Sequence, residues 1–125
     1  MGDKKFCHLH LHSGYSLLDG SGKIKPLIKR AKELGMESIA LTDHGVMYGC
    51  VDLYKEAKAE GIKPILGCEV YVVPKSRKIK NNDEDNKTYH LVLLVKNEKG
   101  YENLMKIVSL ASIEGFYYKP KIGRA

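Results

Sequence analysis

The chain has 125 residues, of which 43% are hydrophobic and 29% are charged, and its net charge is +6. This length is enough for one small domain with a core, and no apolar run approaches the length of a membrane span. The first residues lack a secretory signal and the three cysteines lack zinc-finger spacing, so we expect reduced thiols in a cytoplasmic protein with no membrane partner. The basic balance fits a nucleic-acid or phosphate partner, but solvated lysines are the simpler explanation.

Imidazole and small apolar side chains alternate near the start of the chain. This pattern predicts a strand over residues 6–12, with His8, His10 and His12 on one face. His10 and His12 lie roughly 6–7 Å apart along such a strand, so they can converge on one metal ion or hold two neighbouring ions. Taken alone, this motif is explained equally well by two ordinary histidines on the polar face of a strand. His8 lies deeper on the same face, where we expect a hydrogen-bonded structural histidine.

A turn-rich loop follows over residues 13–22. It contains Asp19 before a glycine, and this pairing usually marks only a turn, so Asp19 is a weak candidate ligand by itself. Apolar residues at helical spacing then predict a helix that begins near residues 23–25, because Pro26 fits only in a first turn. Gly35 is expected to end this helix.

A short strand is predicted over residues 37–41, and the sequence Thr-Asp-His-Gly follows it. His44 then lies at the carboxyl end of a strand, where parallel sheets carry their functional groups. Gly45 lets the backbone turn sharply beside a ligand. Asp43 either orients a histidine as a supporting partner or caps the following turn.

A second helix is predicted over residues 49–60, with Val51, Tyr54 and Ala57 facing inward. The near-continuous apolar run over residues 64–73 indicates a strand that is buried on both faces. Glu69 lies inside this run, and a buried carboxylate needs a cation or strong hydrogen bonds. A bound metal ion satisfies that need, and so does an arginine or lysine partner.

Residues 74–88 hold mixed charges and few apolar side chains, which indicates a flexible surface loop. A fourth strand is predicted over residues 90–95 and a third helix over residues 100–112. His90 opens the fourth strand, which is the wrong end for a parallel neighbour. Antiparallel pairing is expected to place Glu69 and His90 at different ends, so the pairing of this strand stays open.

The predicted order β-α-β-α-β-β-α indicates an α/β fold, with mainly parallel strands and helices outside. Four strands and three helices do not close a barrel, so the fold is either a small open sheet or the first part of a larger one. A mixed set of His, Asp and Glu favours Zn, Mn or Fe over Ca. No serine or cysteine lies in a convincing nucleophile setting, so we predict metal-assisted hydrolysis of a phosphate ester, with metal-bound water as the nucleophile.

In combination, the motifs HLHLHS, LTDHG, GCEVY and YHLVLL resemble the PHP (polymerase and histidinol phosphatase) domain family. FCHLHLHSGYSLLDG and GFYYKP are most similar to the branch at the N-terminus of bacterial replicative DNA polymerase III alpha chains. The resemblance implies the first part of a distorted (β/α)7 barrel and a site for up to three divalent ions, Zn or Mn, with Fe as an alternative. It gives Asp43 a supporting role. The metal ligands that it implies are His10, His12, Asp19, His44, Glu69 and His90.

The family's site takes further ligands from the second half of the domain, so we expect residues 1–125 to be an incomplete N-terminal portion of a PHP domain. The resemblance implies a parent nucleotidyltransferase that carries out Mg-dependent DNA synthesis in DNA replication, with a 3′→5′ exonuclease or other phosphoesterase site in this domain. The implied partners are DNA, the rest of the polymerase chain and replisome subunits. The alternatives are a non-catalytic metal-binding and docking module, or a free-standing PHP phosphatase, which SLLDG and GFYYKP disfavour.

Overall fold

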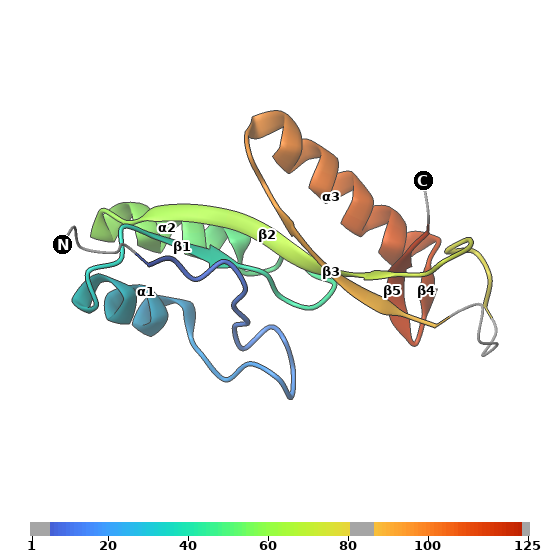
Figure 1. Ribbon diagram of the computed structural model, residues 1–125, viewed down its shortest axis with the longest axis horizontal. Coiled ribbons are helices and arrows are strands. Elements are labelled where there is room, and N and C mark those ends of the chain that lie inside the picture. The colour runs from blue at the N-terminus through green and yellow to red at the C-terminus, as the bar shows by residue number, and fades with distance from the viewer. Residues whose placement is uncertain (1–5, 81–86, 124–125) are drawn as a thin grey trace.

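The computed structural model describes residues 6–80 and 87–123. Figure 1 shows a long strand, β2, running along the molecule, with α1 and α2 near one end and α3, β4 and β5 near the other. Within the described ranges, no helix is long and apolar enough to cross a membrane. The elements in chain order are α1 (Ile24–Glu33), β1 (Ser38–Leu41), α2 (Cys50–Glu60), β2 (Lys63–Val72), β3 (Tyr89–Leu94), α3 (Glu98–Ile113), β4 (Phe116–Tyr117) and β5 (Lys119–Ile122).

The strands form one mixed sheet around β2. β1 pairs with β2 in parallel, and the same register continues past the end of β1, so that His44 lies opposite Glu69. β3 runs antiparallel to β2, with His90 opposite Tyr71. β5 pairs with β2 in parallel at Tyr71, on the edge opposite β3, and β4 pairs antiparallel with β5. The fold is therefore α/β, but parallel and antiparallel pairs are mixed where mainly parallel strands were predicted.

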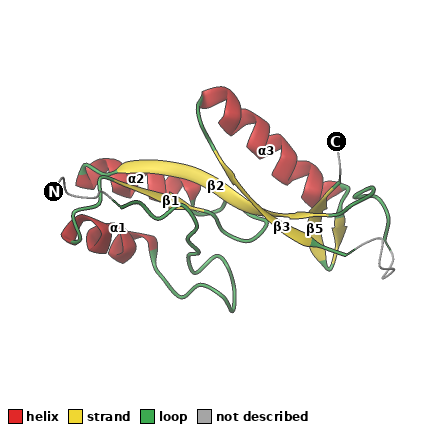
Figure 2. Ribbon diagram, in the orientation of Figure 1, coloured by secondary structure: helices red, strands yellow, loops and turns green. Residues whose placement is uncertain are grey.

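The strand predicted over residues 6–12 is absent, and an irregular segment runs beside β1 instead (Figure 2). The backbone N–H groups of Ala40 and Thr42 donate to the carbonyls of His8 and Leu11, each over 2.8 Å. These partners are two residues apart along β1 and its continuation but three apart on the histidine segment, so one extra residue breaks the ladder. The N–H of Leu11 donates to the side chain of Thr42 over 3.0 Å rather than to a backbone carbonyl.

The loop predicted over residues 74–88 is described only at its ends. Residues 74–80 and 87–88 contain neither helix nor strand, and residues 81–86 lie outside the described part of the chain. Arg77 in this loop pairs with Glu114 at the end of α3, with Nη2 2.5 Å from Oε2. The short strands β4 and β5, which sequence patterns did not indicate, follow α3 directly.

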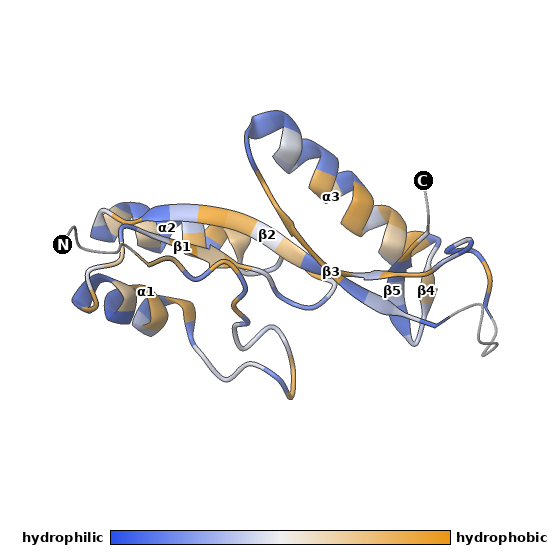
Figure 3. Cartoon of the chain, viewed as in Figure 1, coloured by the Kyte–Doolittle hydropathy of each residue, from blue (hydrophilic) through white to orange (hydrophobic). Residues whose placement is uncertain are grey.

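Two apolar clusters hold the described residues together. In one, α1 and α2 pack against β1 through side chains that include Ile28, Leu41 and Leu53. In the other, Cys68 and Val70 of β2 pack against Leu104 of α3. Figure 3 shows that β2 is hydrophobic through its middle, whereas the start of α3 is hydrophilic. Because side chains alternate along a strand, the face of β2 opposite α3 is free to carry polar groups.

The buried face of α2 is turned by about one residue from the predicted one. Ala57 is buried as predicted, but Cys50 and Leu53 are buried with it, whereas Val51 and Tyr54 are 53% and 50% exposed. Apolar residues at spacings of three and four suit either face, so sequence periodicity does not separate them. The rotation leaves Val51 and Tyr54 beside an open groove of about 760 Å³ between α2 and the start of α3.

Candidate metal centre

All six predicted ligands come together in one connected cluster at the carboxyl end of β1. Within each of three overlapping groups of three residues, the candidate ligand atoms lie within 4.8 Å of one another. Five segments contribute: the irregular histidine segment, the loop after it, the residues that follow β1, and the paired strands β2 and β3. The groups are His10, His12 and Glu69; His12, Asp19 and His44; and His44, Glu69 and His90.

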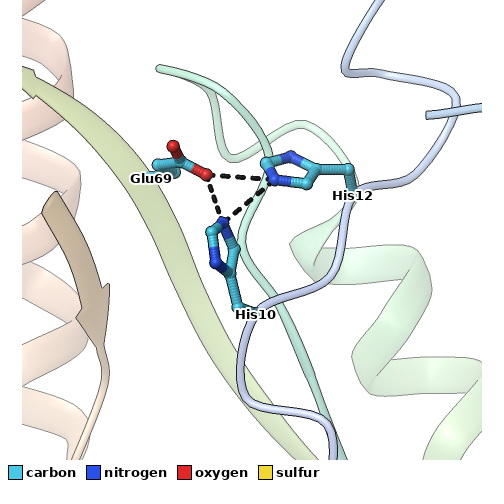
Figure 4. Close-up of side chains that lie close together, drawn as sticks. All are labelled: His10, His12 and Glu69. Carbon is cyan, nitrogen blue, oxygen red and sulfur yellow. Dashed lines mark hydrogen bonds and ion pairs between the residues drawn. The ribbon is translucent and has the colours of Figure 1, made fainter. Parts of the chain in front are cut away.

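Glu69 is the centre of this cluster and is only 3% exposed. Its Oε2 contacts Nε2 of His10 and lies 3.0 Å from Nε2 of His12. Its Oε1 lies 2.5 Å from Nδ1 of His90 and 3.7 Å from Nδ1 of His44. Figure 4 shows His10 and His12 pointing toward the carboxylate from the histidine segment. The partners of this buried acid are therefore imidazoles, which replace the arginine or lysine considered from sequence.

The carboxylates of the cluster are held in their charged form. Burial raises the pKa of Glu69, but hydrogen bonds with His10 and His90 and the charge interactions with His44 and His10 together lower it by more, so the pKa lies below its ordinary value. Asp19 is exposed, and its hydrogen bond with His44, with Oδ2 2.5 Å from Nε2, lowers the pKa of this carboxyl. A charged carboxylate among imidazole nitrogens is a donor set that a divalent cation prefers.

One atom of the cluster lacks a hydrogen-bond partner. Nδ1 of His44 is buried and, among the described residues, makes no hydrogen bond; Oε1 of Glu69 lies 3.7 Å away. Buried polar atoms are nearly always paired, so an orphaned nitrogen that faces a carboxylate marks a place where a cation completes the contacts. The residues present therefore fit a divalent ion.

His90 meets Glu69 although β3 is antiparallel to β2, so the expected separation of these two residues was wrong. The register places His90 opposite Tyr71, which is two residues from Glu69 on the same face of β2. Diagonal neighbours on antiparallel strands lie roughly 7–8 Å apart, which side chains of this length can bridge. Sequence reasoning erred because it compared strand ends without the register.

Asp43 is buried beneath the candidate metal centre, where its partners are serines of the loop that carries Asp19. It is 1% exposed, and its carboxylate accepts three hydrogen bonds. The N–H and Oγ of Ser13 donate over 2.6 and 2.8 Å, and Oγ of Ser16 donates over 2.7 Å. These bonds fasten the loop that carries Asp19 to the end of β1. Sequence reasoning missed both serines, and no spacing rule would have found them, because their partner lies in a distant segment.

His8 does not have the structural role that was predicted for it. Its side chain is exposed, and its ring meets the ring of Phe6 edge-on with centroids 4.8 Å apart. The break in the ladder beside β1 separates it from the face on which His10 and His12 converge. Nε2 of His10 and Nε2 of His12 lie 3.1 Å apart, and the ring of His12 stacks on that of His44 with centroids 4.1 Å apart.

The profile of the PHP domain family matches residues 8–125. The chain belongs to the PHP domain family. DNA polymerase III subunit alpha of Borreliella burgdorferi is 53% identical over 121 residues, which cover 96% of this chain and 10% of that protein. The same subunit of Helicobacter pylori strain 26695 is 53% identical over 127 residues, covering 98% of this chain and 10% of that one. The PHP chain thus spans about 10% of the length of these curated relatives.

Two solved structures share the fold of this PHP chain. A Bifidobacterium adolescentis protein assigned as a metal-dependent phosphoesterase superposes with a TM-score of 0.58 at 23% identity, covering 82% of this chain and 33% of that one. An amidohydrolase from Chromobacterium violaceum superposes with a TM-score of 0.55 at 28% identity, covering 81% of this chain and 32% of that one.

Proposed function

We propose that this PHP domain holds divalent metal ions and hydrolyses phosphodiester bonds as part of a bacterial replicative DNA polymerase. The observation that carries the proposal is the buried carboxylate of Glu69, which faces four imidazoles. A lone buried carboxylate is costly, and the imidazole nitrogens around it, together with the carboxylate itself, are the donor types that Zn and Mn prefer. The fold fits the first part of a distorted (β/α)7 barrel.

Up to three ions are proposed, Zn or Mn with Fe as an alternative, held by the three groups of ligands described above. Glu69 and His12 would hold one ion with His10, and Asp19 and His44 would complete a second group with His12. His90 completes the third. Such ions, when bound, polarise a phosphoryl oxygen and lower the pKa of water toward neutrality.

The chain's own residues set the access to this centre. The side chains of His10, Asp19 and His90 are 53%, 58% and 45% exposed, whereas that of Glu69 is 5% exposed. The centre is therefore open to solvent on its histidine rim and closed at its carboxylate base. A phosphodiester can approach from the rim, and the net charge of +6 favours a polyanion.

The polymerase part of the proposal rests on identities of about 50% to alpha subunits over nearly the whole chain. The parent protein is proposed to carry out Mg-dependent DNA synthesis in the cytoplasm, with DNA, the rest of the polymerase chain and replisome subunits as partners. The PHP domain would then supply a 3′→5′ exonuclease. A structural metal site without catalysis is the competing role.

Exonuclease measurements on the complete polymerase chain test the catalytic role. With Mn or Zn present, we expect nucleotides to be released from the 3′ end of single-stranded DNA. His12→Ala should lower kcat by more than about 100-fold, because loss of a ligand exceeds the roughly 10–100-fold effect of groups that only orient ligands. His8→Ala is the matched control, since His8 is an exposed imidazole on the same segment but outside the cluster.

Two outcomes separate the roles. A parent protein that binds the metal, cleaves no DNA and is unchanged by His12→Ala contradicts the catalytic role and leaves the structural one. Cleavage that falls with His12→Ala and persists with His8→Ala supports the exonuclease.

A further inference from the structure

The hydroxyl of Ser16 lies at the meeting point of three groups beneath the candidate metal centre. Ser16 is 2% exposed. Its Oγ lies 2.7 Å from Oδ1 of Asp43, 3.1 Å from the backbone N of His44 and 3.1 Å from Nδ1 of His12. Two of these neighbours are candidate ligands, so the hydroxyl connects the buried acid to both.

The donors and acceptors in this contact can be counted. A serine hydroxyl has one proton to donate and two lone pairs that accept. The proton goes to the carboxylate of Asp43, which can only accept, and one lone pair takes the N–H of His44. The one remaining lone pair can only accept, so Nδ1 of His12 must donate to it and must therefore carry the proton.

We propose that Ser16 is a positioning residue that fixes His12 in the Nδ1–H form and aims the unprotonated Nε2 into the metal centre. Neutral histidine carries one ring proton, so a proton on Nδ1 leaves a lone pair on Nε2. That nitrogen lies 3.0 Å from Oε2 of Glu69 and 3.1 Å from Nε2 of His10. The inference rests on the proposed metal centre for its purpose, but the proton's position is a property of the metal-free chain.

This arrangement has a cost that a cation removes. A lone pair on His12 Nε2 that faces a charged oxygen of Glu69 is repelled unless a positive ion lies between them. The hydrogen bonds from His12 to Ser16 and from Ser16 to Asp43 hold the ring of His12 in place against this repulsion. An outer partner that fixes the ring form and orientation of a ligating histidine is a common feature of metal sites.

Ser16 also positions the loop that carries Asp19. Its backbone carbonyl accepts the N–H of Asp19 over 3.0 Å and that of Gly20 over 2.8 Å. One residue therefore contacts three of the candidate ligands: His12 through its ring, His44 through its backbone and Asp19 through its backbone. Its hydroxyl acts on the first two and its carbonyl on the third, so removing the hydroxyl alone isolates the effect on the histidines.

The first test is the ring form of His12 in the metal-free full chain. Nitrogen-15 NMR of the histidine side chains distinguishes a protonated ring nitrogen from an unprotonated one, and His12→Gln identifies the signals of His12. We expect Nδ1 of wild-type His12 to be the protonated nitrogen and Ser16→Ala to shift the population toward the other form. A wild-type His12 that carries its proton on Nε2 overturns the inference.

Ser13→Ala is the matched control. Ser13 is as buried as Ser16 and donates its hydroxyl to the same Asp43 carboxylate, but its hydroxyl accepts from the backbone N–H of Tyr15 rather than from a candidate ligand. Both variants should lose stability to a similar degree, because each leaves Asp43 one donor short. Only Ser16→Ala should change the ring form of His12.

Metal titration gives the second readout. With Zn²⁺ or Mn²⁺ alone, Ser16→Ala should weaken binding roughly 10–100-fold, the usual effect of losing an outer partner of a metal-ligating histidine. Ser13→Ala, whose hydroxyl contacts no candidate ligand, should weaken binding clearly less than Ser16→Ala does, and equal losses in the two variants would overturn the inference. A wild-type chain that binds neither ion contradicts the proposed metal centre instead, so the two failures are distinguishable.

Discussion

The candidate metal centre is built from a few side chains whose partners lie far away in sequence. Glu69 could be identified from the sequence as a costly buried acid, because it interrupts an apolar run. Its four imidazole partners lie between 21 and 59 residues away, so the sequence could not say which of several cations or hydrogen bonds satisfies it. Asp43 and Ser16 show the same limit, since the loop geometry that joins them is not encoded in a local pattern.

Asp43 is expected to be a principal support of the site. Asp43→Asn replaces one accepting oxygen with an amide that donates, so it sets a donor against Ser13 or Ser16. We expect the free energy of unfolding to fall by about 2–4 kcal/mol, from lost charge-assisted bonds and an unsatisfied donor. Urea denaturation of the metal-free chain measures this.

Asp52→Asn is the control for that substitution, because Asp52 is exposed on α2. Its carboxylate makes one long contact, 3.5 Å from the hydroxyl of Tyr15. It should change the free energy of unfolding by less than about 0.5 kcal/mol. Similar decreases in the free energy of unfolding in the two variants would show that the buried hydrogen bonds of Asp43 do not stabilise the fold.

Among the elements, the parallel register of β1 on β2 does most to assemble the site, because it continues past β1 and places His44 beside Glu69. Helical spacing and glycines predicted α1, α2 and α3 to within a few residues, since those signals are local. Local signals failed where a segment depends on its neighbour. The histidine segment departs from a strand because one extra residue breaks its ladder, and β4 is too short, at two residues, for any periodicity.

The loop between the histidine segment and α1 is expected to tolerate a side chain at one glycine and not at another. A Cβ on Gly20 would lie 2.2 Å from the carbonyl oxygen of Ser13, whereas the nearest atom to a Cβ on Gly14 is 4.0 Å away. Gly20→Ala must therefore shift the backbone beside Asp19. It should lower the free energy of unfolding by about 1–3 kcal/mol and weaken Zn²⁺ binding, as an overpacked site does.

Gly14→Ala provides the comparison within the same loop. It should leave both the thermal midpoint and Zn²⁺ affinity close to those of the wild-type chain. If Gly20→Ala also leaves the thermal midpoint and the Zn²⁺ affinity unchanged, the loop is not held as tightly as the contacts of Ser13 and Ser16 require.

At the scale of the whole molecule, β2 separates an apolar cluster on one face from the candidate metal centre on the other. Cys68 and Val70 face Leu104 of α3 in an apolar cluster, and Glu69 between them faces the opposite side with the histidines. The sequence predicted this buried strand and the α/β class, but not the mixed pairing of the sheet. Burial raises the pKa of the Cys50 thiol to about 11 and that of the Cys68 thiol to about 12, and neither cysteine belongs to the three groups of candidate ligands.

The most direct measurement of the central claim is anomalous X-ray diffraction at the zinc edge from crystals of the full chain grown with Zn²⁺. We predict an anomalous peak at the point where His10, His12 and Glu69 converge, with metal–ligand distances of about 2.0–2.2 Å, and loss of this peak in Glu69→Gln. Wild-type crystals with zinc only at surface sites elsewhere, and none within reach of Glu69, would contradict a metal centre in this chain.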